Sequence, residues 1–90
     1  MANHSVVILG GARTPMGGLQ GSLSGATAVE LGTAAVKAAI DRSGVKPGDI
    51  EEVLLGCVLP AGLKQGPARQ VGLNAGIPNS AGCVTVNKLC

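Results

Sequence analysis

The stretch Val53-Leu54-Leu55-Gly56-Cys57-Val58-Leu59 decides the fold class, because it is apolar throughout and is closed by Pro60. A strand with one face in water alternates apolar and polar side chains. An uninterrupted apolar run of this length is instead typical of a parallel strand that is covered on both faces. We therefore predict a buried strand over 53–59 and a parallel sheet around it.

The segment before this strand predicts a helix over 27–43. Thr27-Ala28-Val29-Glu30 matches a capping box, and apolar residues then recur at helical spacing. Gly44 supplies a left-handed C-cap, and Pro47 prevents the helix from continuing. The abundant alanines of this helix allow close packing against a sheet or a second helix.

The segments further out complete an alternating order of strands and helices. A second helix is predicted from Pro67 to near Gly76, since proline is well suited to the first position of a helix. The β-branched run Val6–Leu9 and the segment Val84–Leu89 read as a first and a third strand. Residues 12–25 and 60–66 read as glycine-containing loops. Right-handed crossovers then give an α/β fold with a mainly parallel sheet.

The composition indicates a part of a larger protein body. The 90 residues include no Phe, Tyr or Trp, and only 13% are charged, while 46% are hydrophobic. Aromatic side chains usually supply much of a small core, and a chain of this size buries a modest share of its surface. We expect much of the surface to contact other protein.

Charge and targeting signals exclude several classes of function. The basic residues are dispersed and the net charge is only +2, so we expect no nucleic-acid partner. The apolar run Val6–Leu9 is too short for a signal peptide or a membrane span. Three cysteines without a secretion signal favour free thiols in a reducing compartment, and we expect a cytoplasmic protein without a membrane partner.

The glycines after the first predicted strand do not form a nucleotide site. Gly10-Gly11 is followed by Ala12-Arg13-Thr14-Pro15, so the spacing of the dinucleotide fingerprint fails. The Gly-Lys-Ser/Thr of a P-loop is also absent. We expect these glycines to serve turns and close packing, and we predict no cofactor-binding or metal-binding residues.

The polar side chains near the loops have mainly structural interpretations. Arg13 lies just past a strand and can bind an anion, but we favour a tie to a nearby carboxylate or carbonyl. Gln65 and Arg69 flank the start of the second helix, and the same two interpretations, an anion site or a structural tie, apply to them. His4 is a poor candidate for a general base. The acidic residues Asp49, Glu51 and Glu52 read as a solvated turn.

The three cysteines differ in position. Cys57 lies inside the apolar run and is expected to be an inert core thiol. Cys83 opens the third predicted strand and is expected to be structural. Cys90 comes at the carboxyl end of that strand, where α/β proteins place their chemistry. A thiolate there, facing a helix N-terminus, is a candidate nucleophile, although the chain shows no partner base for it.

Five segments, in order, resemble thiolases of the acetyl-CoA acetyltransferase type, and together they cover nearly the whole chain. They are Arg13-Thr14-Pro15-Met16-Gly17, Thr27-Ala28-Val29-Glu30-Leu31-Gly32, Leu55-Gly56-Cys57-Val58-Leu59, Gln65-Gly66-Pro67-Ala68-Arg69-Gln70 and Thr85-Val86-Asn87-Lys88-Leu89-Cys90. The last is the most specific, and it puts Cys90 at the position of the family's catalytic cysteine. Lys64 and Gly66 stand where the family more often has Gly and Asn.

The resemblance implies a thiolase-like fold of two layered α/β halves, with residues 1–90 as the incomplete opening part of the first half. It implies that Cys90 is acylated by an acyl-CoA and that two acetyl-CoA condense to acetoacetyl-CoA, or the reverse thiolysis occurs. CoA thioesters are then substrates and no cofactor is needed. The activating histidine, the second cysteine and most CoA contacts are expected in other polypeptide, so we expect no activity from these residues alone. A homodimer or homotetramer is implied.

Two alternatives to a thiolase stay open. A ketoacyl synthase or a hydroxymethylglutaryl-CoA synthase uses a cysteine on the same fold, although Val86-Asn87-Lys88-Leu89-Cys90 favours thiolase. A non-catalytic α/β interaction module with an incidental terminal cysteine belongs to a different class. A test for cleavage of acetoacetyl-CoA by free CoA distinguishes a thiolase from the two synthases. Labelling of Cys90 with and without acetyl-CoA distinguishes an enzyme from a non-catalytic module.

Overall fold

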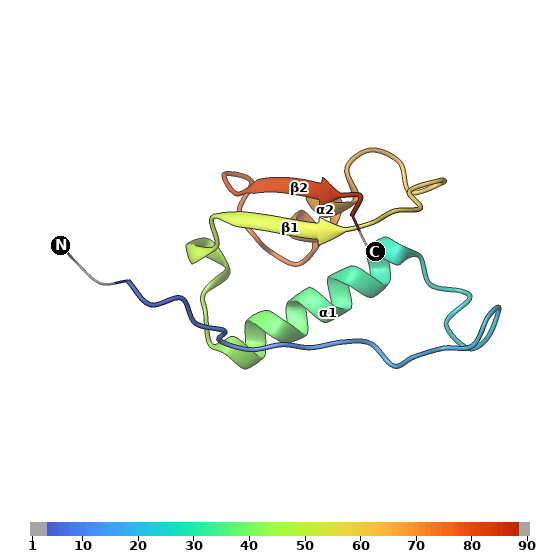
Figure 1. Ribbon diagram of the computed structural model, residues 1–90, viewed down its shortest axis with the longest axis horizontal. Helices are drawn as coiled ribbons and strands as arrows, with labels where there is room; N and C mark the ends of the chain where they lie inside the picture. Colours follow the sequence, from blue (N-terminus) through green and yellow to red (C-terminus); the bar gives the residue numbers. More distant parts are fainter. Residues whose placement is uncertain (1–3, 89–90) are drawn as a thin grey trace.

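A computed structural model describes residues 4–88 of the chain. Its elements, in order, are α1 (Ala28–Ser43), the 3-10 helix η1 (Pro47–Asp49), β1 (Glu52–Gly56), α2 (Pro67–Asn74) and β2 (Gly82–Val86). Figure 1 shows the two strands side by side, with α1 along one side of them and α2 behind. The predicted alternation of helix and strand is confirmed from residue 27 onward.

The helix α1 begins and ends where its sequence signals predict. The Thr27 hydroxyl accepts a hydrogen bond from the Glu30 N–H at 3.1 Å, and the Glu30 carboxylate accepts one from the Thr27 N–H at 3.3 Å. This reciprocal pair is a complete capping box. Gly44 ends the helix with a left-handed φ of 73°. The start and the end of α1 are thus set by residues within or next to it.

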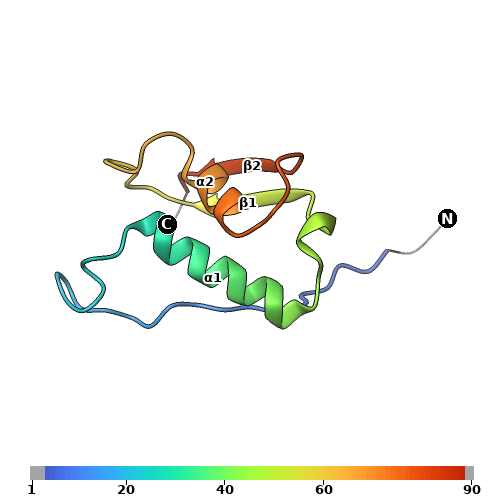
Figure 2. The same cartoon turned by 180° about the vertical axis from the view of Figure 1, so that it is seen from behind.

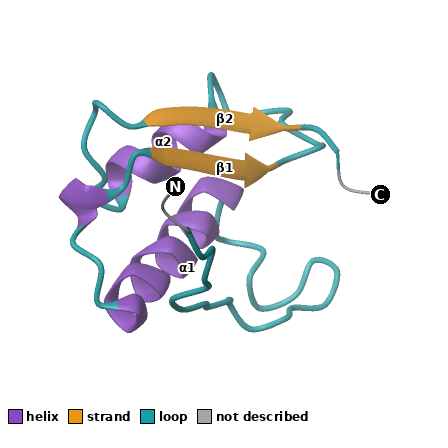
Figure 3. Cartoon of the chain, turned by 60° about the vertical axis from the view of Figure 1, so that its left-hand side comes forward, coloured by secondary structure: helices purple, strands orange, loops and turns teal. Residues whose placement is uncertain are grey.

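The strands β1 and β2 pair in parallel. Glu52 lies opposite Gly82, and the register continues to Gly56 opposite Val86. Two further backbone bonds extend the ladder, from the Gly82 N–H to the Glu51 carbonyl at 3.1 Å and from the Cys57 N–H to the Val86 carbonyl at 2.9 Å. Because α2 joins two parallel strands, it runs back along the sheet and begins at their carboxyl ends (Figure 3).

The core lies where α2 packs on both strands and α1 packs on α2. The buried residues Val53, Ala68, Ile77 and Ala81 form the core. Around them pack partly buried side chains from α1, from the end of η1 and from both strands: Val36, Ile40, Ile50, Leu55 and Cys83. The core is therefore built from small aliphatic side chains, as the absence of aromatic residues requires.

The strand predicted over 53–59 ends earlier than expected, and residues 4–88 cover only one of its two faces. The strand covers Glu52–Gly56, and the chain leaves the sheet after Cys57. Leu54 is 68% exposed and Val84 is 52% exposed, because residues 4–88 place nothing over the face opposite the helices. A continuous apolar run predicts that both faces of a strand are buried, but it does not identify the segment that covers each face.

The predicted first strand, Val6–Leu9, is not a strand in this structure. Figure 1 shows this segment as an extended trace that lies apart from the sheet and runs toward the end of α1. Val6 and Ile8 are 99% and 94% exposed, while Val7 and Leu9 border a hollow shared with Ile40 of α1. The side chains alternate as in a strand, but a strand also needs backbone partners, and no segment among residues 4–88 pairs with this one.

The remaining predicted boundaries shift by a few residues. The second helix begins at Pro67 as expected and ends at Asn74. The third predicted strand, 84–89, is observed as Gly82–Val86, so it begins earlier and ends before Asn87. Residues 12–25 and 60–66 are irregular as predicted. Within the described part of the chain, no helix is long and apolar enough to cross a membrane.

Candidate active site

The carboxyl ends of β1 and β2 and the start of α2 meet at one edge of the sheet. Figure 2 shows this arrangement from behind, with α2 against both strands. β2 ends at Val86, and Asn87 and Lys88 continue the chain from this edge with exposed side chains. Cys90, the predicted nucleophile, follows four residues after Val86 and lies outside the described residues. The described site is therefore the framework from which the Cys90 segment departs.

Two consecutive residues at the start of α2, Ala68 and Arg69, hold the two ends of β2. The Ala68 N–H donates to the Thr85 hydroxyl of β2 at 3.1 Å. The Arg69 guanidinium donates to the Ala81 carbonyl at 2.9 Å and to the Asn79 carbonyl at 3.0 Å, in the connection between α2 and β2. These bonds join α2 to β2 directly and through the loop that precedes it.

Gln70 holds the connection on the other side of α2. Its amide nitrogen donates to the Leu63 carbonyl at 2.6 Å and to the Gln65 carbonyl at 2.9 Å. The loop between β1 and α2 is therefore fastened to the first turns of α2. Arg69 thus has the structural role that was one of its two interpretations, whereas the role of the Gln65 side chain stays a prediction, because only its backbone carbonyl takes part in this bond.

The same loop contains two left-handed residues next to the helix start. Lys64 has φ 67° and Gly66 has φ 60°. Side chains with a Cβ atom rarely adopt this conformation, whereas Gly adopts it freely and Asn more often than other residues. Gly66 therefore adopts this conformation without strain, whereas Lys64 is strained.

The two described cysteines have free thiols and are half-buried. Cys83 lies on the covered face of β2: its sulfur is 3.9 Å from an Arg69 guanidinium nitrogen, and a Cβ atom on Gly72 would approach it to 3.4 Å. Its structural interpretation agrees with this packing. Cys57 follows β1 and is partly accessible, so the expectation of a fully buried core thiol is too strong.

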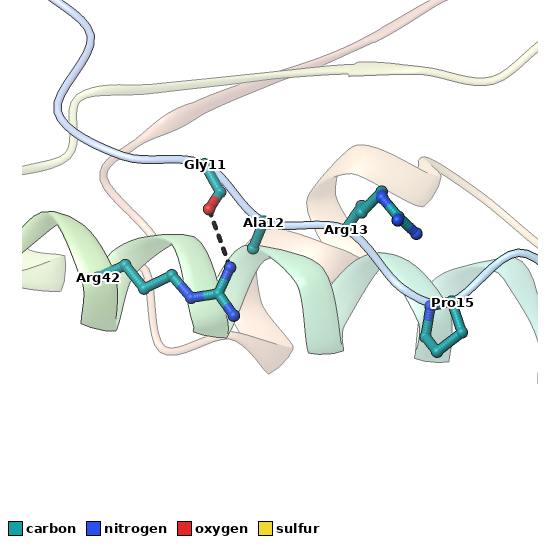
Figure 4. Close-up of a pocket in the computed structure, with 5 residues that line it drawn as sticks. All are labelled: Gly11, Ala12, Arg13, Pro15 and Arg42. Atoms are coloured by element: carbon teal, nitrogen blue, oxygen red, sulfur yellow. Dashed lines mark hydrogen bonds between the residues drawn. The ribbon is translucent and has the colours of Figure 1, made fainter.

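An open hollow at the N-terminal segment holds the arginine that the sequence singled out. Figure 4 shows it, lined by Gly11, Ala12, Arg13, Pro15 and Arg42. The Arg42 guanidinium reaches from α1 to the Gly11 carbonyl at 3.2 Å, whereas Arg13 points away from Arg42 and bonds only the carbonyl of its neighbour Thr14 at 3.0 Å. Arg13 thus ties to a carbonyl, as favoured, and the long-range tie in this region comes from Arg42.

The other polar candidates lie away from the sheet edge. His4 is exposed. Asp49 closes η1 and Glu51 is exposed before β1, in agreement with a solvated turn, whereas Glu52 is exposed but begins β1, so the turn prediction is wrong for this residue. None of these residues contributes to the framework around the Cys90 segment.

Sequence reasoning missed the roles of Thr85 and Gln70. The sequence did indicate that α2 lacks a cap of its own, because the helix starts at Gly66-Pro67 and glycine has no side chain to cap it. A helix without a local cap needs an acceptor from elsewhere, but the sequence does not say which segment supplies it.

Comparison with known proteins identifies a family for almost the whole chain. Residues 6–90 match the model of the family "Thiolase, N-terminal domain". The cytosolic acetyl-CoA acetyltransferase of Gibberella zeae is 54% identical over 91 aligned residues, which cover 100% of this chain and 23% of that protein. Acetyl-CoA acetyltransferase 2 of Arabidopsis thaliana is 56% identical over 87 residues, covering 97% of this chain and 22% of that protein.

Solved structures show the same fold. The Acat5 thiolase of Ascaris suum, determined in complex with coenzyme A, superposes with a TM-score of 0.88 at 44% identity, over 90% of this chain and 21% of that one. The acetyl-CoA acetyltransferase of Syntrophomonas wolfei gives a TM-score of 0.84 at 41% identity, over 89% of this chain and 20% of that one. The chain spans less than a quarter of the length of these proteins, and the family match, the identities and the shared α/β fold together show that it belongs to the thiolase family.

Proposed function

We propose that the natural polypeptide carrying this chain is an acetyl-CoA C-acetyltransferase and that Cys90 is its acyl-carrying nucleophile. The observation that supports this most directly is the uninterrupted similarity to proteins named acetyl-CoA acetyltransferases, through a family match that reaches residue 90. These names favour a thiolase over a ketoacyl or hydroxymethylglutaryl-CoA synthase. Residues 1–90 would form the opening part of the N-terminal half.

The position of Cys90 in the sequence, shortly after β2, supports this role. The described residues place the carboxyl end of β2 beside the N-terminus of α2, and Cys90 follows that strand end in the sequence. Ligands and reactive groups of parallel α/β sheets gather at this edge. A cysteine suits thioester exchange, since its thiolate is a strong nucleophile and also a good leaving group.

The proposed reaction has two steps that balance in atoms and charge. In the first, the Cys90 thiolate attacks the carbonyl carbon of acetyl-CoA, the carbon–sulfur bond to CoA breaks, and CoA leaves as a thiolate. In the second, a base removes a proton from the methyl carbon of another acetyl-CoA. The resulting carbanion attacks the acetyl-cysteine, which releases the Cys90 thiolate and acetoacetyl-CoA. Thiolysis follows the same steps in reverse, and the base is expected outside residues 1–90.

The experiment compares cysteine variants of the natural polypeptide that carries this chain. Cleavage of acetoacetyl-CoA by free CoA is measured for the wild type, for Cys90→Ala and for the matched controls Cys57→Ser and Cys83→Ser. Cys90→Ala should reduce kcat on the order of a thousandfold or more. The controls should stay within about threefold of the wild type, because neither thiol belongs to the proposed reaction.

Labelling of the thiols adds a readout that does not depend on turnover. Iodoacetamide should modify Cys90 faster than a free thiol peptide, and acetyl-CoA should slow this modification. Wild-type protein that lacks thiolysis and shows no acetyl-CoA protection of Cys90 would contradict the proposal and would leave the non-catalytic interaction module.

Two further properties of the whole protein belong to this proposal. A homodimer or homotetramer is expected, and light scattering on the purified polypeptide tests it. The cytoplasmic location stays a prediction. One relative is named cytosolic and another, the enzyme of Xenopus tropicalis, is named mitochondrial, so fractionation of the source cells is the measurement.

A further inference from the structure

The helix α2 begins without a cap of its own. Its N-cap residue is Gly66, which makes no side-chain hydrogen bond, and Pro67 at the first position has no N–H to donate. Ala68 therefore carries the first backbone donor of the helix, and this residue is 0% exposed. A buried N–H without a partner is costly. The Thr85 hydroxyl supplies the acceptor at 3.1 Å, from a strand 17 residues later in the chain.

This bond attaches β2 to α2, in addition to the pairing of β2 within the sheet. Within residues 4–88, β2 pairs with β1 alone, so one of its edges has no backbone partner there. The strand is instead held to α2 at both ends. Arg69 bonds the Ala81 carbonyl just before β2, and Thr85 bonds Ala68 near its carboxyl end. The two contacts resist sliding and twisting of β2 relative to α2.

Thr85 and Val86 are the last described residues before Cys90 with a defined partner. The Val86 carbonyl accepts from the Cys57 N–H of the neighbouring strand at 2.9 Å. Between Val86 and Cys90 lie only Asn87, Lys88 and Leu89. The direction in which the chain leaves the sheet is therefore set by two bonds, one to β1 and one to α2.

We propose that Thr85 is a positioning residue for Cys90, acting through its hydroxyl bond to the first turn of α2. The inference rests on the proposed role of Cys90 as the nucleophile. Thr85 does not touch the substrate in this account. It holds the end of β2 so that the thiolate reaches the acyl carbon along a productive line, and a small misplacement of a nucleophile lowers the rate of attack strongly.

The effect should fall on kcat and not on KM. The described residues around Thr85 contact other protein groups: the hydroxyl bonds Ala68, and the neighbouring Cys83 packs on Gly72. A shift of β2 would change the attack geometry and leave contacts to the CoA moiety, which the proposed function puts in other polypeptide, unchanged. If Thr85 were only a helix cap, its loss would lower the free energy of unfolding and leave the kcat of the folded enzyme unchanged.

The experiment uses Thr85→Val and Thr85→Ser in the natural polypeptide. Valine keeps the shape of threonine and removes the acceptor, while serine keeps the hydroxyl. The matched control is Thr33→Val, because the Thr33 hydroxyl also makes a hydrogen bond to the backbone, although it donates to the Val29 carbonyl at 2.7 Å and stays within α1. The readouts are kcat and KM for thiolysis, corrected for the folded fraction, and the iodoacetamide rate at Cys90 with Cys57 as an internal reference.

Thr85→Val should lower kcat and the labelling rate at Cys90 on the order of tenfold, with KM within about twofold of the wild type. Thr85→Ser and Thr33→Val should keep kcat within about twofold. If Thr85→Val does not fold, Thr85→Ala is compared with Thr85→Ser in the same way.

The outcomes separate this inference from the proposed function. An active wild type, with Cys90 protected by acetyl-CoA, together with an unchanged kcat and labelling rate in Thr85→Val, would overturn the positioning role alone. An equal loss of kcat in Thr33→Val would also overturn it. A wild type without thiolysis and without protection overturns the proposed function instead.

Discussion

A Cβ atom placed on Gly32 of α1 would lie 3.1 Å from the Cγ2 atom of Val71 in α2. Val71 is fully buried, and a valine in a helix has little freedom to change its rotamer. The two helices thus approach each other over a glycine that carries no side chain. This contact explains a glycine inside a helix, where alanine is otherwise preferred.

Gly32→Ala should therefore destabilise the protein. Alanine favours a helix over glycine by about 1 kcal/mol, but overpacking a core contact costs about 1–3 kcal/mol, so we expect a net loss of about 1 kcal/mol in the free energy of unfolding. Urea unfolding of the natural polypeptide is the measurement. In a Val71→Ala background the same substitution should stabilise, because the opposing methyl group is gone. Stabilisation by Gly32→Ala in the wild-type background would contradict this account.

Lys64→Gly should stabilise the loop between β1 and α2. Lys64 has φ 67°, and a left-handed residue with a Cβ atom is strained by about 1–2 kcal/mol. Part of this is offset by the greater flexibility of glycine in the unfolded chain, which leaves an expected gain of about 0.5–1 kcal/mol in unfolding experiments. Lys46→Gly is the control, because Lys46 has φ −75° and gains nothing from glycine. A loss of stability in Lys64→Gly would refute the strain.

Arg69→Ala should weaken the attachment of β2 to α2. The guanidinium bonds two carbonyls, those of Ala81 and Asn79, and the substitution leaves both without this donor. We expect a loss of about 2 kcal/mol, as for two hydrogen bonds from a charged group. Arg13→Ala is the control, since the one bond described for Arg13 goes to its neighbour Thr14, and it should cost less than about 0.5 kcal/mol. Equal losses in the two variants would argue against a special role of Arg69.

Thr27→Ala should shorten or fray the start of α1. Both bonds of the capping box disappear or weaken, because the Thr27 hydroxyl accepts from Glu30 and its backbone N–H donates to the Glu30 carboxylate. The expected loss is about 1 kcal/mol. Thr27→Ser should be nearly neutral, since serine provides the same oxygen. Thermal unfolding and amide hydrogen exchange at residues 28–31 are the measurements, and normal protection there in Thr27→Ala would disprove the prediction.

Sequence reasoning was most successful where one segment contains its own determinants. The helix 27–43 was predicted to within one residue because Thr27, Glu30 and Gly44 all act on their near neighbours. The start of α2 at Pro67 follows from the same kind of local restriction. The candidate nucleophile Cys90 came from a motif and its register with four upstream segments, and its role remains a prediction because it lies outside the described residues.

The amino-acid sequence alone determined the family, the bounds of α1, the start of α2 and the parallel α/β class, because local dihedral preferences, caps and motif order are properties of neighbouring residues. Only the tertiary structure decided that Val6–Leu9 pairs with no strand among residues 4–88, that these residues leave the face of Leu54 and Val84 uncovered, and that Thr85 caps α2. Each of these depends on a hydrogen-bond partner or a packing surface supplied by a segment distant in the chain. The identity of the contacted residues does not reveal which distant segment supplies the partner.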